Sequence, residues 1–360
     1  IAEAMEGASN LVGAFDVSTS VYSQSLSVAA KETDPNGIVF NPTGSKMFVI
    51  GTSSDAVHEY ALSALFDVTT AVFTQTFSVA AQTTFPRGLA FNPAGTEMFV
   101  VDGYSGGIRQ YTLSTGFDVS TTSYTRNFST TPQDGDPHGV AFNTDGTKMF
   151  VIGVASDSVN EYTLSSGFDI STSVFVDAFS IAAQETSPQD VVFNADGTKM
   201  FIAGLATDTV FQYTLSTGFD ASTASYDSVS FSVASQDTSP QGITFSPDGT
   251  KLYIIGAQND SAYEYTVGTT SYTNQMNKTQ LDAVTDANHI VLGNDLDLAI
   301  VFNLASGTTV PSSDGVAINY DANVLNELAV AGTDYDADFP ATDKVRITAR
   351  AGANLKVRVV

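Results

Sequence analysis

The sequence predicts an all-β fold: a five-bladed β-propeller with 51-residue, four-stranded blades, followed by a small β-sandwich-like domain. Three observations support it: an internal repeat of 51 residues, four short strand patterns in each repeat, and a loss of the repeat near residue 277. A four-stranded unit of this length suits a propeller blade, whereas one coil of a β-helix needs about half as many residues.

Four sequence markers define the repeat and stay in register along the chain. A Phe-Asp pair opens each unit, at Phe15, Phe66, Phe117, Phe168 and Phe219. A second marker, read as Pro-x-Gly, places its proline at Pro35, Pro86, Pro137, Pro188 and Pro240. A Phe-Asn-x-x-Gly turn and a Glu/Gln-Tyr pair recur with the same spacing, ending in a variant turn at Phe245 and in Tyr265. Five copies predict five blades.

Each unit contains four short strand patterns. In the third unit we expect strands at about 139–143, 147–153, 158–164 and 173–181. Between the first two, Gly146 supplies the positive φ that a tight turn needs. The second pattern is a continuous apolar run, which is typical of a strand that is covered on both faces, as the inner strands of a propeller blade are.

The fifth unit lacks the Phe-Asp loop and the strand pattern that follows it. Tyr265 is followed by the next aromatic residue, Tyr272, after seven positions, whereas the other units need 13. The missing piece is present at the other end of the chain, from Phe15 onward. We therefore predict that residues 15–30 form the outer strand of the fifth blade and close the ring, which removes exposed apolar blade faces. In the alternative, 271–276 pairs normally and 15–30 caps the first blade.

One extra residue lies in the fourth unit. Phe179 and Phe231 are 52 positions apart, although Phe168 and Phe219 are separated by 51. Because a slip of one residue would turn every later side chain to the opposite face, the strand should absorb it locally. The spacing predicts a β-bulge within Asp227–Ser230, with Phe231 in the position that Phe179 has in the third blade.

The predicted domains are a lead-in at 1–14, the closed propeller at 15–276 and a β-rich assembly or attachment domain at 277–360. The last domain begins with a possible short helix at 278–287, and its apolar segments include Leu325–Val330. Its final residues are rich in basic groups, which predict an edge that docks another chain; the alternative is a solvated face. These residues are Lys344, Arg346, Arg350, Lys356 and Arg358.

Composition excludes several functional classes. The formal net charge is −25, from 39 acidic and 14 basic residues, which argues against nucleic-acid partners and anionic membranes. Without cysteine, the sequence has no disulfide, thiolate zinc site or cysteine nucleophile. No apolar run reaches the roughly 18 residues of a membrane span, and no signal-peptide pattern opens the chain. We expect no membrane insertion.

The sequence predicts no catalytic residue and no cofactor. The histidines, His58, His138 and His289, stand at unrelated places and are interpreted as surface or loop residues. Most carboxylates recur once per blade, which indicates a structural role in turns. They form two series: Asp16, Asp67, Asp118, Asp169 and Asp220, and Asp55, Asp157, Asp208 and Asp260. A weak calcium candidate is formed by the alternate carboxylates Asp334, Asp336 and Asp338.

The middle residue of the Pro-x-Gly marker is the most variable polar position. It should lie near one mouth of the central channel, where five different side chains could bind a small polar ligand or glycan. The alternative is a solvated loop. The predicted ligand-binding residues are Asn36, Arg87, His138, Gln189 and Gln241.

Two stretches carry family resemblances. The phrases at 240–253 and 260–265 resemble the YVTN-type propeller repeat, and this likeness covers about residues 15–270. The segments 286–295, 315–320 and 356–360, with the Phe-Asp-Val-Ser-Thr repeats, resemble structural proteins of tailed bacteriophages, especially marine ones. The first resemblance implies a fold, because such propellers include enzymes, surface proteins and binding scaffolds.

The second resemblance implies a non-enzymatic virion protein, such as a fibre, spike or tail-associated component. The propeller would be a receptor-binding head, and the C-terminal domain would serve assembly in a homo-oligomer. Its partners would be other virion proteins and a host surface receptor or glycan, and its location the virion. The alternatives are a propeller hydrolase or lactonase, with an acid and a base, with or without a metal, at one channel mouth, and a bacterial cell-surface adhesin.

Overall fold

The structure is a computed structural model in which residues 13–268 and six C-terminal strands are described. The chain forms two compact units, and one of them is Gly13–Gly268. The second unit contains the C-terminal strands. Each unit is described by itself.

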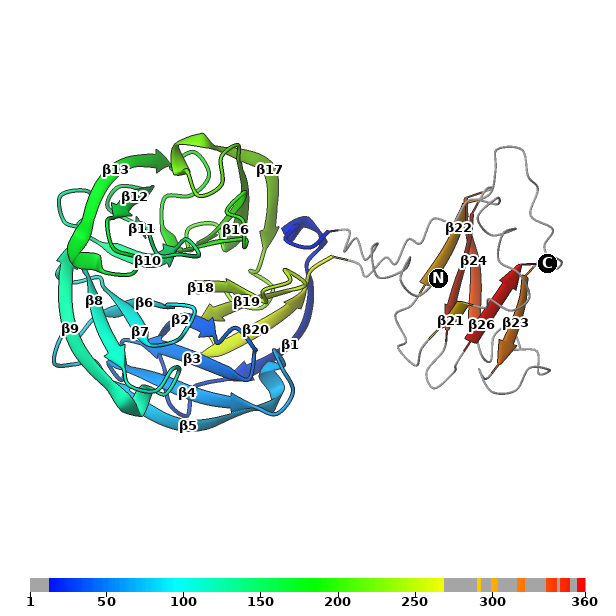
Figure 1. The fold of residues 1–360 in the computed structure, drawn as a ribbon, viewed down its shortest axis with the longest axis horizontal. Coiled ribbons are helices and arrows are strands. Elements are labelled where there is room, and N and C mark those ends of the chain that lie inside the picture. The colour runs from blue at the N-terminus through cyan, green and yellow to red at the C-terminus, as the bar shows by residue number, and fades with distance from the viewer. Residues whose placement is uncertain are drawn as a thin grey trace. The chain divides into compact units, whose positions relative to one another are not determined.

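Gly13–Gly268 is a propeller of five antiparallel, four-stranded blades (Figure 1). Blade one contains β2 (Pro35–Phe40), β3 (Lys46–Gly51), β4 (Ala56–Leu62) and β5 (Ala71–Ser78). Blade two contains β6 (Pro86–Phe91), β7 (Glu97–Asp102), β8 (Gly107–Leu113) and β9 (Thr122–Ser129). Blade three contains β10 (Pro137–Phe142), β11 (Lys148–Gly153), β12 (Ser158–Leu164) and β13 (Ser173–Ser180). Blade four contains β14 (Pro188–Phe193), β15 (Lys199–Gly204), β16 (Thr209–Leu215) and β17 (Ala224–Ser232).

Blade five is built from both ends of the propeller sequence. Its strand order is β1 (Val21–Ser27), β20 (Ser261–Thr266), β19 (Lys251–Gly256) and β18 (Pro240–Phe245). Figure 1 shows the blue β1 beside the yellow β20. The predicted closure is therefore confirmed, and the alternative in which this segment caps blade one is wrong. Residues 271–276 lie outside the described part of the chain.

The phenylalanine that opens each unit packs between two neighbouring blades. Phe117 has a φ of 56°, and its N–H donates to the carbonyl oxygen of Gly95 over 3.0 Å. Its ring lies on this turn glycine, where a Cβ would come within 2.2 Å of the ring. The ring also lies 5.4 Å from Phe91 of its own blade and 6.2 Å from Phe48 of blade one. All five copies share the left-handed backbone: Phe15, Phe66, Phe117, Phe168 and Phe219.

A lysine–glutamate pair of one blade forms hydrogen bonds with the Phe-Asp loop of the next blade. Lys46 Nζ lies 2.7 Å from Glu59 Oε1 and donates to the carbonyl oxygen of Phe117 over 2.7 Å. Glu59 Oε2 accepts from the N–H of Val119. Blades three and five repeat the arrangement through Lys148–Glu161 and Lys251–Glu264. Blade four uses Gln212 Oε1, which accepts from the N–H of Val17 at the ring closure.

The bulge expected in blade four is present and is an enlarged form of a bulge in the other blades. In blade three one residue, Val176, stands between the paired positions of β13. In blade four two residues, Asp227 and Ser228, stand there, and Ser228 adopts a φ of 59°. Phe231 pairs with Val210 as Phe179 pairs with Val159. The prediction is confirmed, although the smaller bulges were not expected.

The C-terminal unit contains two three-stranded sheets. One has the order β21 (Ile290–Leu292), β26 (Leu355–Val359), β23 (Val316–Tyr320), and the other β22 (Ala299–Asn303), β25 (Lys344–Ala349), β24 (Tyr335–Ala341). The β-rich content agrees with the prediction, whereas face-to-face packing of the sheets stays a prediction. The segments 278–287 and 325–330 lie outside the described residues.

The basic C-terminal residues do not lie on an edge strand. Lys344 and Arg346 belong to β25, and Lys356 and Arg358 to β26, and each of these strands is the middle one of its sheet. Their backbone groups pair with strands on both sides, so a partner cannot extend the sheet there. Arg350 lies outside the described residues. The assembly role stays a prediction, but it cannot use β25 or β26 as a free edge.

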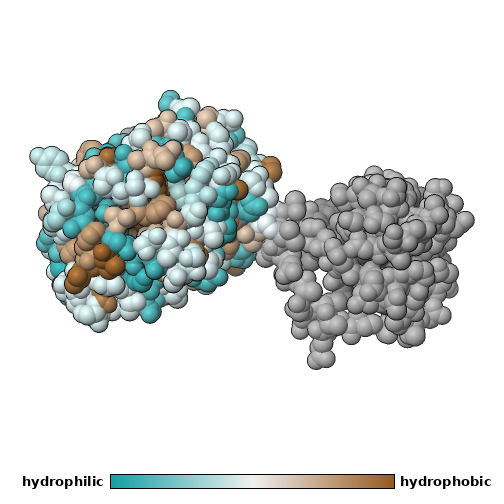
Figure 2. Space-filling view, turned by 90° about the horizontal axis from the view of Figure 1, so that it is seen from above, coloured by the Kyte–Doolittle hydropathy of each residue, from teal (hydrophilic) through white to brown (hydrophobic). Residues whose placement is uncertain are grey.

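The face of the propeller in Figure 2 is mostly hydrophilic to neutral, with hydrophobic residues gathered in a few places. Several of the exposed large apolar side chains belong to outer strands, such as Val21, Val72 and Val174. Within the described residues, no helix has the length and apolarity that a membrane crossing requires.

We predict that ring closure can be trapped covalently. Val21 of β1 faces Thr266 of β20 in the strand register, and the natural chain has no cysteine. Val21→Cys with Thr266→Cys should form a disulfide during mild oxidation, detected by thiol titration and peptide mapping. The control pair, Val21→Cys with Val72→Cys on blade one, should keep its thiols. A bond in the control pair and none in the first would contradict the closure.

Candidate functional site

The innermost strands of the five blades surround a central channel. These strands are β2, β6, β10, β14 and β18, and each begins at the proline of the repeat marker. The residues after the proline therefore occupy successive levels of the channel. Three of these levels line the channel. The first level is the variable residue after the proline, and the second level is the residue that follows it. The third level lies two positions further along the strand.

The second level is a narrow waist. In four blades it holds glycine: Gly37, Gly88, Gly139 and Gly242. A Cβ on Gly88 would lie 2.6 Å from the carbonyl oxygen of His138 on the next blade, and one on Gly37 would lie 3.0 Å from that of Arg87. Adjacent innermost strands thus approach so closely that a Cβ would be crowded, which is a common reason for glycine within a strand.

Blade four departs from this rule. Its marker reads Pro188-Gln189-Asp190, so an aspartate stands where the other blades have glycine. The carboxylate reaches across the waist: Oδ1 would lie 2.4 Å from a Cβ on Gly139 of blade three. Oδ2 accepts from the N–H of Ile243 of blade five over 3.1 Å, and Oδ1 accepts from that of Val191 over 2.9 Å. Asp190 therefore bridges both neighbouring blades.

The surroundings of Asp190 change its acidity. Burial raises the pKa of this carboxyl to about 7, against the lowering effect of its hydrogen bonds from Ile243 and Val191. Desolvation is the dominant cause, because a carboxylate loses more hydration than two amide donors restore. The side chain still lines a cavity and is only partly exposed. A carboxyl that titrates near neutral pH in a cavity is a candidate acid–base group.

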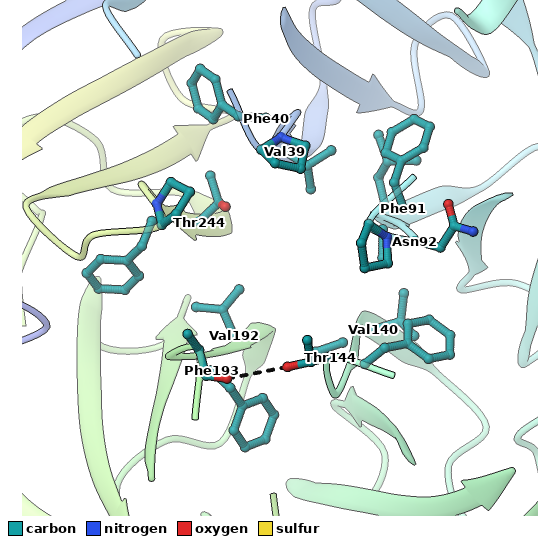
Figure 3. A pocket seen from close by; sticks show the side chains of 18 of the residues that line it. Val39, Phe40, Phe91, Asn92, Val140, Thr144, Val192, Phe193 and Thr244 are labelled. Atoms are coloured by element: carbon teal, nitrogen blue, oxygen red, sulfur yellow. Dashed lines mark hydrogen bonds between the residues drawn. The ribbon is translucent and has the colours of Figure 1, made fainter. Parts of the chain in front are cut away.

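This cavity occupies the channel on one side of the waist and has a volume of about 400 Å³. One residue per blade, two positions after the waist, forms a mostly apolar ring: Val39, Ala90, Ala141, Val192 and Thr244. Figure 3 shows Val39, Val192 and Thr244 around the open centre. Eight phenylalanines and three prolines complete most of the wall. Asp190 is the one carboxylate among the described residues that line it.

Most polar side chains in the cavity wall are engaged in turns. The Oδ1 atoms of Asn92 and Asn143 accept from backbone N–H groups of their own turns. Ser246 Oγ accepts from the N–H of Lys251. Thr144 Oγ1 donates to the carbonyl oxygen of Ala195, as the dashed line in Figure 3 shows. These groups hold the shape of the mouth.

The five predicted ligand-binding residues lie at the first level, on the other side of the waist. Arg87 Nη1 donates to Asn36 Oδ1 over 2.8 Å, and His138 Nδ1 lies 2.7 Å from Gln189 Oε1. Gln241 Nε2 donates to Ser239 Oγ. Four of these side chains are buried, and Arg87 is half-buried. The structure pairs Arg87 with Asn36 and His138 with Gln189, but Arg87 Nε and His138 Nε2 are buried without a hydrogen-bond partner among the described residues. Ligand binding by the five residues stays a prediction.

Two histidines differ from the expectation of surface or loop positions. His138 is buried at the first level, and His58 is buried within blade one. His58 Nδ1 lies 2.6 Å from Thr76 Oγ1, and Nε2 lies 2.9 Å from Ser54 Oγ. These contacts satisfy the imidazole and allow its burial. His289 lies outside the described residues.

The recurrent aspartates have the structural role that the sequence predicted. Asp16, Asp67, Asp118 and Asp169 each accept from the N–H two residues on and cap the short turn that follows. Asp220 lacks this bond. The second series, at Asp55, Asp157, Asp208 and Asp260, has positive φ values of 46–52°. Of the calcium candidate, Asp336 and Asp338 lie in β24, and Asp334 lies outside the described residues; calcium binding there stays a prediction.

The exceptional Asp220 belongs to a different acidic cluster. Carboxylate oxygens of Glu161, Asp177 and Asp220 lie within 4.8 Å of one another, and this is the one such group of three among the described residues. Asp177 Oδ1 is buried and has no hydrogen-bond partner in the described part of the chain. Burial and then the charge of Asp220 raise the pKa of Asp177, whereas Lys148 lowers it.

The equivalent positions in two other blades show what is missing. In blade one, Gln75 Nε2 donates to both Glu59 and Asp118, each over 2.7 Å. In blade five, Gln24 Nε2 donates to Glu264 and Asp67. Asp177 stands where these glutamines bridge two carboxylates, so blade three has three acceptors and no bridging donor.

Comparisons with known proteins come from a family model and from solved structures. Residues 4–164, less than half of the chain, match the family described as the SMP-30/gluconolactonase/LRE-like region. No curated protein matches the sequence. Among solved structures, a functionally unknown protein from Desulfotomaculum acetoxidans is 15% identical, with a TM-score of 0.39, over 62% of this chain and 65% of that protein.

Two further solved structures are enzymes by their descriptions. The periplasmic gluconolactonase PpgL of Pseudomonas aeruginosa is 16% identical, with a TM-score of 0.35, over 54% of this chain and 52% of that one. A luciferin-regenerating enzyme is 14% identical, with a TM-score of 0.43, over 68% and 96%. This chain spans less than two thirds of the Desulfotomaculum protein and of PpgL. At these scores the likenesses carry no functional argument.

The family match corrects the function expected from the sequence. The description of the matched family names gluconolactonase. Neither the YVTN-type repeat nor a phage module is among the matches. The match contradicts both the non-enzymatic character and the assignment to a virion, fibre or tail. The phage resemblance rested on the general residue pattern of the segments and not on a diagnostic motif. Many turn-rich β proteins share such a pattern. The match favours the alternative of a propeller hydrolase or lactonase.

We predict that Asp177→Gln stabilises the protein. A raised pKa in the folded state means that ionisation of Asp177 costs stability as pH rises above its ordinary value near 3.8. Glutamine removes that charge and supplies the donor seen in blades one and five. The free energy of unfolding should increase by about 1 kcal/mol at pH 7, and by less at pH 4.

The measurement is urea unfolding with EDTA present, and Asp227→Gln is the matched control. Asp227 lies in the same part of the outer strand of blade four but pairs with Lys199 Nζ over 2.7 Å. The control should therefore lose stability. Equal effects of the two substitutions would show that the unbridged cluster is not a source of strain.

Proposed function

We propose that this propeller hydrolyses lactones and that the reaction takes place at Asp190 in the central channel. The observation that carries the proposal is the single carboxyl at the waist, where the other four blades have glycine. The aspartates that cap turns in this fold recur in several blades, whereas a catalytic group is needed once. The partial match to a family described by gluconolactonase supports the same reaction class.

In the proposed reaction Asp190 is the general base. Its carboxylate takes a proton from water as the water oxygen attacks the carbonyl carbon of the lactone. The ring C–O bond then breaks, and the leaving oxygen receives the proton from Asp190, so lactone and water become a hydroxy acid. The N–H groups of Val191 and Ile243 hold the carboxylate in place. A base whose pKa lies near the working pH combines basicity with the correct protonation state.

The proposal has a defined pH dependence. Because burial raises the pKa of Asp190 to about 7, the base is mostly protonated at pH 6 and mostly ionised at pH 8. We predict that kcat/KM for lactone hydrolysis increases through an apparent pKa near 7. Asp190→Asn should lower it by a factor of about 100 or more, since asparagine cannot accept the proton.

The measurement is pH-stat hydrolysis of a panel of aliphatic and sugar lactones. Asp145→Asn is the control, because Asp145 is exposed in a turn outside the cavity wall. This variant should keep the wild-type rate and pH profile. A lactonase activity that survives in Asp190→Asn, or the absence of hydrolysis across the panel, would refute the proposed function.

A further inference from the structure

We propose that the cavity beside Asp190 accepts an uncharged lactone with a hydrocarbon body, rather than a polyhydroxylated or phosphorylated sugar lactone. The inference rests on the proposed function and specifies the substrate class of the same site. Three features of the cavity support it: the chemistry of its wall, the engagement of its polar groups, and its charge.

The wall nearest Asp190 offers apolar contact. Four of the five side chains of the ring above the waist are aliphatic, and Thr244 is the exception. Leu89, Val140 and Ile243 lie beside them in the wall. A ligand body in contact with this ring would be enclosed by hydrocarbon, which favours apolar ligands in proportion to the area removed from water.

The same wall has few free partners for hydroxyl groups. The oxygen acceptors of Asn92 and Asn143 and the hydroxyl of Ser246 are used by backbone N–H groups of the mouth turns. The hydroxyl of Thr144 is directed to a backbone carbonyl oxygen. A sugar lactone would bury several hydroxyls here, and each one that loses water without a protein partner lowers affinity by roughly tenfold.

The charge of the cavity opposes an anionic ligand. Among the described residues that line it there is no lysine or arginine, and its one charged group is Asp190. The guanidinium of Arg87 belongs to the first level, across the waist, and donates to Asn36. A phosphate in the cavity would face a carboxylate without a counter-charge, which is a costly arrangement. The volume of about 400 Å³ is within the range of small-molecule sites.

The inference can be tested by binding and turnover in parallel. Binding is measured by calorimetry with 6-pentylpiperidin-2-one, the unreactive lactam counterpart of δ-decalactone. Ala141→Leu fills the ring without changing Asp190 and should weaken lactam binding at least tenfold. The matched control is Ala178→Leu on the exposed outer strand β13, which should bind as the wild type does. If Ala141→Leu does not fold, Val39→Thr adds a hydroxyl at nearly constant volume and should weaken binding severalfold.

Turnover compares δ-decalactone, glucono-δ-lactone and 6-phosphoglucono-δ-lactone. We expect kcat/KM for δ-decalactone to exceed both others by at least about 100-fold. A preference for either sugar lactone, or lactam binding that is absent or unchanged in Ala141→Leu and Val39→Thr, would overturn the inference while the proposed function could stand. Specific lactam binding without hydrolysis of any lactone would instead refute the proposed function and leave the apolar ligand class in place.

Discussion

The close approach of the five innermost strands is the constraint on which the channel depends. With only five blades, neighbouring strands meet so tightly at the waist that a Cβ on Gly37, Gly88, Gly139 or Gly242 would be crowded by the next blade. Asp190 breaks this rule and fills the waist with a carboxyl group. The same closeness removes water from it, so the geometry that divides the channel also raises the pKa of the one carboxyl that lines the cavity among the described residues.

The outer parts of the blades keep this ring closed. Each Phe-Asp loop inserts a phenylalanine between two blades, and a lysine or glutamate of the preceding blade holds several of these loops from the other side. At the closure the loop comes from the N-terminal segment: the N–H of Phe15 donates to Gly249, and that of Val17 donates to Gln212. The contact between blades four and five therefore repeats the contacts between the other blades. As a result, the innermost strands keep the same close spacing around the ring.

Much of the fold follows from the repeat itself. The number of blades, the closure by residues 15–30 and the bulge near Ser228 could all be predicted, because each depends on counting along the chain. No strand was expected at β24, where the sequence indicated only a calcium candidate. The basic strands were expected at an edge, although pairing in the sheet places them in the middle, and strand order is not a property of a single segment.

The site was harder to predict than the fold. Asp190 is visible in the sequence as the one departure from Pro-x-Gly, but its importance depends on how closely other blades approach it. The variable polar ring was chosen because it lies near the channel, whereas the pairing of Arg87 with Asn36 and of His138 with Gln189 depends on side chains 51 residues apart. The residue pattern of the C-terminal segments indicated a virion protein, and only the family match favoured a lactonase instead.

The close packing at the waist should make the carboxyl of Asp190 titrate near neutral pH. The most direct measurement is the pH titration of aspartate side-chain carboxyl carbons by NMR in ¹³C-labelled protein, with Asp190→Asn to identify the resonance. The account predicts that the signal lost in this variant titrates with a pKa of about 7. A pKa near the ordinary value of about 4 would contradict it, because Asp190 would then be as well solvated as a surface residue.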